Sequence, residues 1–115
     1  MGKKQIPKSA GEAALADLPN QLPTAVRYLL QQIEQKHPGG TIELRVPPYG
    51  AVQCIGGLDH RRGTPPNVVE MDAQTLIGLC NGSLDLSNEV LSGKVFLSGS
   101  RAGEISELFP ALIRE

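Results

Sequence analysis

One run of polar residues, Asp59-His60-Arg61-Arg62, has side chains that could bind a charged ligand. The guanidinium groups of Arg61 and Arg62 can hold a carboxylate or phosphate head group through paired hydrogen bonds. The alternative is a solvated loop whose arginines pair weakly with nearby acids. His60 could serve as a general base in a small hydrolase or isomerase, but no Ser or Cys nucleophile lies beside it in the sequence. We therefore expect a binding or structural loop here and no catalytic residue.

The two cysteines, Cys54 and Cys80, are candidates for reactive thiols or metal ligands. A reactive thiol needs partly exposed, electropositive surroundings. Cys80 instead falls on the apolar face of a predicted helix, and Cys54 falls within a predicted strand. One His, one Asp and two distant cysteines do not match zinc-ligand spacing, and Gly56-Gly57 lacks the Lys-Ser/Thr ending of a phosphate loop. We expect two structural cysteines, no metal and no cofactor.

Size and charge exclude several classes of protein. A chain of 115 residues forms one domain with one modest core. Its net charge of −1, with two Phe, two Tyr and no Trp, provides neither an attractive field for phosphates nor a surface on which bases could stack. No apolar stretch is long enough to span a bilayer, and no apolar run follows the early lysines as in a signal peptide. We expect a cytoplasmic protein with no nucleic-acid partner and no stable membrane insertion.

Residues 1–19 differ in composition from the rest of the chain, because they are first basic and then rich in alanine. Ser9 and Glu12 have the spacing of a capping box, in which each side chain pairs with a free amide at the start of a helix. Gly11 weakens that helix. We expect a flexible or partly docked arm here, followed by the domain at residues 20–115. Attraction of its lysines to an anionic membrane is the alternative role.

The first half of the domain predicts a helix and a strand pair. Pro23 suits the first turn of a helix, where its missing N–H costs nothing. Residues 38–40, Pro-Gly-Gly, end that helix. Residues 41–46 alternate between apolar and polar, as in a half-buried strand, and residues 51–55 return as a second one. One face of the helix is apolar: Val26, Leu29, Leu30 and Ile33.

The second half predicts a strand at residues 68–71 followed by two helices. Asp72 can cap the first helix, and Gly82 can end it with a positive φ. Asp85 or Ser87 starts the second. The inward positions of the two helices are Ala73, Leu76, Ile77 and Cys80, then Leu86, Val90 and Leu91.

A last strand and helix complete the pattern. In the strand at residues 94–98, Val95 and Leu97 share one face, and Phe96 and Ser98 share the other. The helix after it repeats apolar residues at i, i+3, i+4 and i+7, and Pro110 should bend or break it. Those apolar residues are Ile105, Leu108, Phe109 and Leu112.

These elements predict an α+β fold. Apolar strand and helix faces must cover one another, so we expect one twisted, mostly antiparallel or mixed sheet of four to five strands. The helices should pack mainly on one face. Residues 56–66 are the least regular stretch of the domain and could supply only a short fifth strand.

Several runs in the second half resemble the sterol-carrier-protein-like domain family, in which a strand ending in Asp precedes two Gly-terminated helices and a Gly-Lys-apolar strand. The matching runs are Val69-Glu70-Met71-Asp72, Leu76-Ile77-Gly78-Leu79-Cys80-Asn81-Gly82 and Val90-Leu91-Ser92-Gly93-Lys94-Val95-Phe96-Leu97-Ser98-Gly99. Residues 45–54 and 62–70 are similar to the small stand-alone bacterial members. Larger members have another clear strand after the hairpin, and this chain does not.

The resemblance implies a function, the non-catalytic binding or carriage of a lipid, acyl or sterol-like molecule between the sheet and the C-terminal helices. The alternative is an interaction module with a filled core, either a homodimer or an accessory domain of a partner enzyme. On the first interpretation Arg61 and Arg62 would hold a polar head group. The apolar pocket would be formed by Leu76, Cys80, Val90, Leu91, Phe96, Ile105, Phe109 and Leu112.

Overall fold

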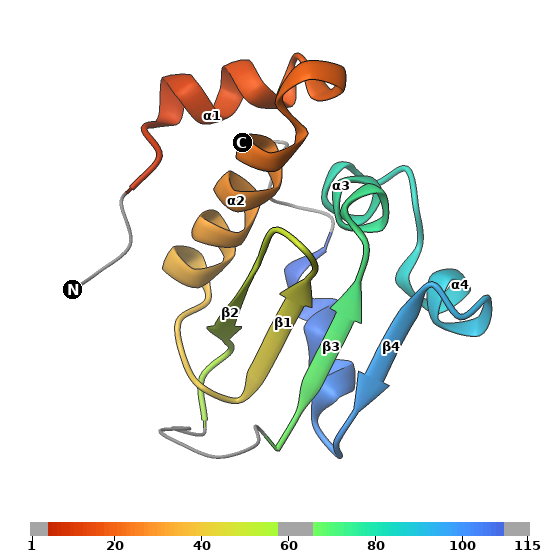
Figure 1. The fold of residues 1–115 in the computed structure, drawn as a ribbon. Coiled ribbons are helices and arrows are strands. Elements are labelled where there is room, and N and C mark those ends of the chain that lie inside the picture. The colour runs from red at the N-terminus through yellow and green to blue at the C-terminus, as the bar shows by residue number, and fades with distance from the viewer. Residues whose placement is uncertain (1–4, 58–65, 110–115) are drawn as a thin grey trace.

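The computed structural model describes residues 5–57 and 66–109 (Figure 1). The helices and strands, in chain order, are α1 (Lys8–Leu15), α2 (Leu18–Lys36), β1 (Ile42–Val46), β2 (Gly50–Cys54), β3 (Val68–Met71), α3 (Ala73–Asn81), α4 (Leu86–Leu91), β4 (Val95–Ser98) and the 3-10 helix η1 (Ala102–Leu108).

The four strands form one mixed sheet in the order β2-β1-β3-β4. β1 pairs with β2 in an antiparallel hairpin, and β3 pairs antiparallel with β4. The two central strands, β1 and β3, run parallel, with Leu44 opposite Val69. The predicted α+β fold with a mixed sheet is confirmed. Most of the stretch considered for a fifth strand lies outside the described residues.

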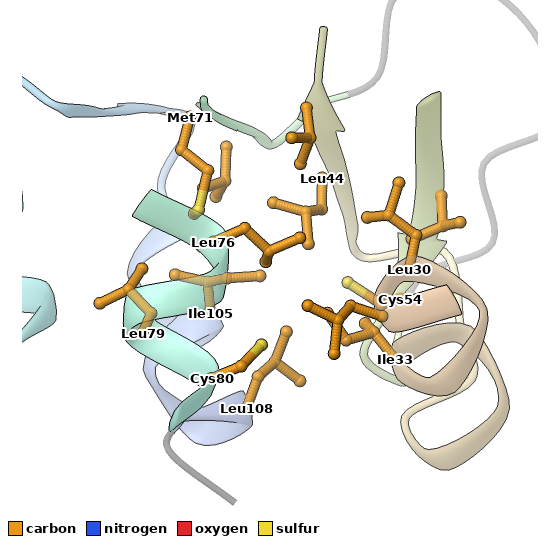
Figure 2. Close-up of a cluster of buried hydrophobic side chains, with 14 of the residues drawn as sticks. Leu30, Ile33, Leu44, Cys54, Met71, Leu76, Leu79, Cys80, Ile105 and Leu108 are labelled. Carbon is orange, nitrogen blue, oxygen red and sulfur yellow. The ribbon is translucent and has the colours of Figure 1, made fainter. Parts of the chain in front are cut away.

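One face of the sheet is covered by helices. Alternate residues of β1 are buried, Ile42, Leu44 and Val46, while Glu43 and Arg45 point to the other, half-exposed face. In Figure 1 the strands lie in front and η1 passes behind them. Side chains from α2, α3, η1 and all four strands meet in one apolar cluster. Figure 2 labels residues of this cluster from α2, α3, η1 and the strands β1, β2 and β3: Leu30, Ile33, Leu44, Cys54, Met71, Leu76, Leu79, Cys80, Ile105 and Leu108.

Local capping follows the predicted rules in the second half. The Asp72 carboxylate accepts a hydrogen bond from the Thr75 N–H at 2.9 Å, and Asp85 accepts one from the Asn88 N–H at 3.3 Å. The bond from Thr75 holds the pKa of Asp72 below its usual range, and bonds from the Ser87 hydroxyl and then the Asn88 N–H do the same for Asp85. Gly82 ends α3 with φ of 85°, a conformation that costs glycine little.

The predicted last α-helix is wrong in type and length. Ala102, Ile105 and Leu108 are buried at a spacing of three residues, and this spacing aligns side chains in a 3-10 helix. Phe109 follows in an extended conformation with φ −114° and ψ 144°. The reason is Pro110, because the ring of a proline excludes the helical region for the residue before it. Phe109 therefore does not share a helix face with Ile105.

The N-terminal segment packs on α2. Gly11 lies so close to Tyr28 that an added Cβ would come within 2.3 Å of the ring, and Ala14 is fully buried. The predicted capping box is wrong, since Pro7 is the N-cap and no side chain caps α1. α2 begins at Leu18, before the predicted start. A non-helical Gln21 interrupts it, so Pro23 lies near the start of the longer straight part.

A buried asparagine joins three segments at one end of the sheet. Asn67 is only 2% exposed. Its Nδ2 donates to the Thr41 carbonyl oxygen, and its Oδ1 accepts from the Arg101 N–H, both at 2.9 Å. Its own carbonyl oxygen accepts from the Glu43 N–H. Gly99 is needed beside it, because a Cβ there would lie 2.4 Å from Oδ1.

We expect Asn67→Ala to lower the free energy of unfolding by about 1–3 kcal/mol, since it leaves the buried Thr41 carbonyl and the part-buried Arg101 N–H without their partner. Asn88→Ala, at an exposed position on α4, is the matched control and should change it by less than about 0.5 kcal/mol. Chemical denaturation measures both. Equal losses would show that the Asn67 side chain is not a stabilising link.

Both cysteines lie in the core as free, fully buried thiols. Burial raises the pKa of the Cys80 thiol to about 12. Burial, and after it the negative charge of Glu34, raise the pKa of Cys54 to about 12 as well. A thiol is nucleophilic only as the thiolate. Neither cysteine is therefore expected to react as a nucleophile at neutral pH.

Alkylation at neutral pH should therefore be slow in the folded protein and fast after denaturation. The folded state holds these protons more tightly than the unfolded chain, where the thiol pKa is near 9.0. The free energy of unfolding should be unaffected by them below about pH 8 and should fall as the pH rises from about 9 toward 12. The double variant Cys54→Ala, Cys80→Ala should lose this part of the alkaline dependence. Rapid labelling of the native protein would contradict the assignment.

Candidate functional site

Three of the predicted ligand-binding residues, Leu76, Cys80 and Ile105, lie together in the core and are 0% exposed. Val90 and Phe109 are partly buried and pack against the same cluster. These five residues are brought together, but as packed core. A ligand could reach the three fully buried side chains only if the core opened.

The other predicted residues do not join that group. Leu91 is 86% exposed, and no residue of the short helix α4 is buried. Phe96 is 63% exposed, because it lies on the face of β4 opposite Val95. Arg61, Arg62 and Leu112 lie outside the described residues.

A groove of about 700 Å³ lies at the β2 edge of the sheet, between the N-terminal segment, α2 and the β1–β2 hairpin. In Figure 1, α2 lies beside the β1–β2 hairpin, and the N-terminal segment lies to the left of α2. The N-terminal wall consists of Gln5, Ile6, Pro7 and Ala10. The α2 wall consists of Thr24, Arg27, Leu30, Gln31 and Glu34, and the hairpin wall of Tyr49, Gly50, Ala51 and Val52.

Side-chain amides attach the N-terminal wall to α2. The Ile6 N–H donates to Gln31 Oε1 at 2.8 Å, and Gln31 Nε2 donates to the Ile6 carbonyl oxygen at 2.9 Å. One turn further along the helix, Gln35 Nε2 donates to Gln5 Oε1 at 2.7 Å. The Gln31 side chain therefore pairs with both backbone polar groups of Ile6.

The α2 wall separates the groove from the core. Leu30 contributes to both, since it is 3% exposed, belongs to the core cluster and lines the groove. An added Cβ at Gly50 would lie 3.4 Å from Leu30 Cδ1, so the hairpin approaches the helix closely here. Arg27 and Glu34 place opposite charges on the exposed side of the same wall.

The groove has the size and the kind of lining that are typical of small-molecule pockets. Its volume lies within the range of small-molecule pockets, and apolar side chains with a few polar groups are the usual lining of such pockets. Neither His nor Cys lines it. Across the described part of the chain, no group of three His, Cys, Asp or Glu side chains could hold a metal ion.

Sequence reasoning missed the groove, although part of the signal was present. Arg27, Gln31 and Glu34 follow a helical spacing on one side of α2, a pattern that also describes an ordinary solvated face. The missing information was the position of the N-terminal segment. The bonds between Ile6 and Gln31 join residues 25 apart, and no local pattern reports them.

No helix of the described residues is long and apolar enough to cross a membrane. No curated protein matches the chain. A family model described as bacterial SCP ortholog matches residues 19–111, which include every strand and all helices except α1 and the start of α2. The chain therefore belongs to the sterol-carrier-protein-like family of bacterial SCP orthologues.

Proposed function

We propose that this protein binds and carries a hydrophobic small molecule without transforming it, and that the groove beside α2 is the binding site. Membership of the sterol-carrier-protein-like family supports lipid binding in general terms. The observation that carries the location is the groove itself, about 700 Å³ in volume and largely apolar.

Energetics favour the groove over the predicted site between the sheet and the C-terminal helices. A pocket of about 300 Å³ opened in the core would cost on the order of 7 kcal/mol, at about 24 cal/mol per Å³. A domain has only about 5–15 kcal/mol of stability in total. Leu76, Ile105 and Leu108 fill that space with no exposed surface, whereas the groove is already open.

The lining residues also support carriage rather than catalysis. Thr24 and Tyr49 line the groove, and within the described residues neither hydroxyl forms a hydrogen bond to a general base. Nucleophilic catalysis requires such a partner within hydrogen-bond distance. The groove therefore offers apolar contact and charge, the two means of holding an amphipathic molecule.

Substitution of Ala10 tests the location. Ala10 and Ala13 are both exposed alanines on α1, and only Ala10 lines the groove. Ala10→Leu should fill part of the groove and weaken binding of decanol by about tenfold, equivalent to about 1.4 kcal/mol. Ala13→Leu should leave the affinity unchanged. Isothermal titration calorimetry measures both, and ligand at about 100 times its Kd should stabilise the wild type by about 2.7 kcal/mol.

Phe109→Ala distinguishes the groove from the core. Phe109 packs against the core cluster and does not line the groove, so we expect the variant to lower stability without changing the affinity for decanol. If Phe109→Ala weakened binding and Ala10→Leu did not, the ligand would lie between the sheet and the C-terminal helices. If no ligand shifted the melting temperature of the wild type, the carrier function would be wrong.

An interaction module is the second candidate function. Leu91 and Phe96 are large apolar side chains that remain 86% and 63% exposed, and large exposed apolar residues are typical of contact surfaces when they are contiguous. On this hypothesis sedimentation analysis should give a mass that rises with concentration. The double variant Leu91→Ser, Phe96→Ser should then remain monomeric. A wild type that stays monomeric at all concentrations would reject self-association.

A further inference from the structure

Opposite charges lie toward the two ends of the groove wall formed by α2. Arg27 and Glu34 both line the groove and are both exposed. They are seven residues apart in a regular stretch of helix, so they lie on nearly the same side, about 10 Å apart along its axis. In the described part of the chain neither of them forms an ion pair with another side chain. Each charge is therefore available to a ligand.

The wall between these charges offers little polar recognition. Gln31 lies between them, and both its Oε1 and its Nε2 are already bonded to the backbone of Ile6. Across the groove from α2 the lining is mainly apolar and includes Ile6 and Val52. A ligand in this space would therefore meet apolar surface along its middle and one charge near each end.

The last turn of α2, which contains Glu34, lies toward the end of β2. Just after that strand the Ile55 N–H donates to the carbonyl oxygen of His37, the residue that ends α2, at 2.7 Å. Leu30, one turn earlier on the helix, lies beside Gly50 at the start of the same strand. The groove thus has a negative end toward the end of β2 and a positive end toward the start of α2.

We propose that the groove selects amphipathic molecules by polarity: it takes a ligand with an anionic group near Arg27 and a cationic or hydrogen-bond-donating group near Glu34, joined by an apolar chain. A molecule with an anion at both ends would place one of them against Glu34. This inference rests on the proposed function, because it assumes that the groove binds the apolar chain.

Four ten-carbon ligands distinguish binding of an apolar chain in the groove from selection by polarity: decanol, decanoic acid, ω-aminodecanoic acid and decanedioic acid. Calorimetry at low ionic strength keeps the charges unscreened. For the wild type we expect ω-aminodecanoic acid to bind about two- to fivefold more tightly than decanoic acid. Decanoic acid should in turn bind more tightly than decanedioic acid by a similar factor. Exposed ion pairs give effects of this size. These preferences should shrink as salt is added.

Charge reversal then tests each end separately. Glu34→Lys should make decanedioic acid the preferred ligand, and Arg27→Glu should make decanediamine preferred. The double variant Arg27→Glu, Glu34→Lys should again bind ω-aminodecanoic acid most tightly, because that ligand can bind in the opposite direction. Glu107→Lys, an equal change of charge at an exposed position outside the groove, is the control and should keep the wild-type order.

The outcomes separate the inference from the function. If decanol binds and the three charged ligands bind with equal affinity, the polarity is wrong and the carrier function stands. If Glu34→Lys changes the order of the ligand affinities no more than Glu107→Lys does, the proposed polarity is again wrong. If none of the four ligands binds, both the groove as a lipid site and its polarity are wrong.

Discussion

The arrangement of the sheet and its covering helix depends on one buried amide, that of Asn67. It bonds to the backbone of Thr41 just before β1 and to that of Arg101 just before η1, while its own carbonyl accepts from Glu43. A buried amide needs these partners, because an unpaired polar group in the core is costly. The same three bonds hold the parallel pair β1–β3 in register and place η1 beneath it. Gly99 leaves the space they require.

With η1 in that place, the space between sheet and C-terminal helices is closed. Ala102, Ile105 and Leu108 pack every third residue against α3 and the strands, and Pro110 sets the extended turn at Phe109 that ends this contact. The groove lies on the other side of Leu30, which contributes to both the core and the groove. α2 therefore has two functions in the fold, since one face completes the core and the neighbouring face forms the groove.

The features that follow local rules could be predicted from the sequence. The caps at Asp72 and Gly82 and the alternation of residues 41–46 need only neighbouring residues, and they were found where predicted. The mixed sheet followed from the order of elements and the family resemblance. Asn67 and the groove could not be predicted, because the bonds that make them join residues 24 to 34 apart. Phe109 was misplaced because a helical spacing outweighed the proline that follows it.

The groove combines segments inside and outside the region that matches the family model. The α2 and hairpin walls lie within the family match, whereas the segment containing Ile6 and Ala10 precedes it. That segment is held by the Gln31 and Gln35 side-chain amides, and beyond them by the contact of Gly11 with Tyr28. Each hydrogen bond contributes about 1 kcal/mol, far less than the core that the strands and η1 form. The wall formed by residues 5–7 is therefore attached less firmly than the α2 and hairpin walls, which are built on the core and the sheet.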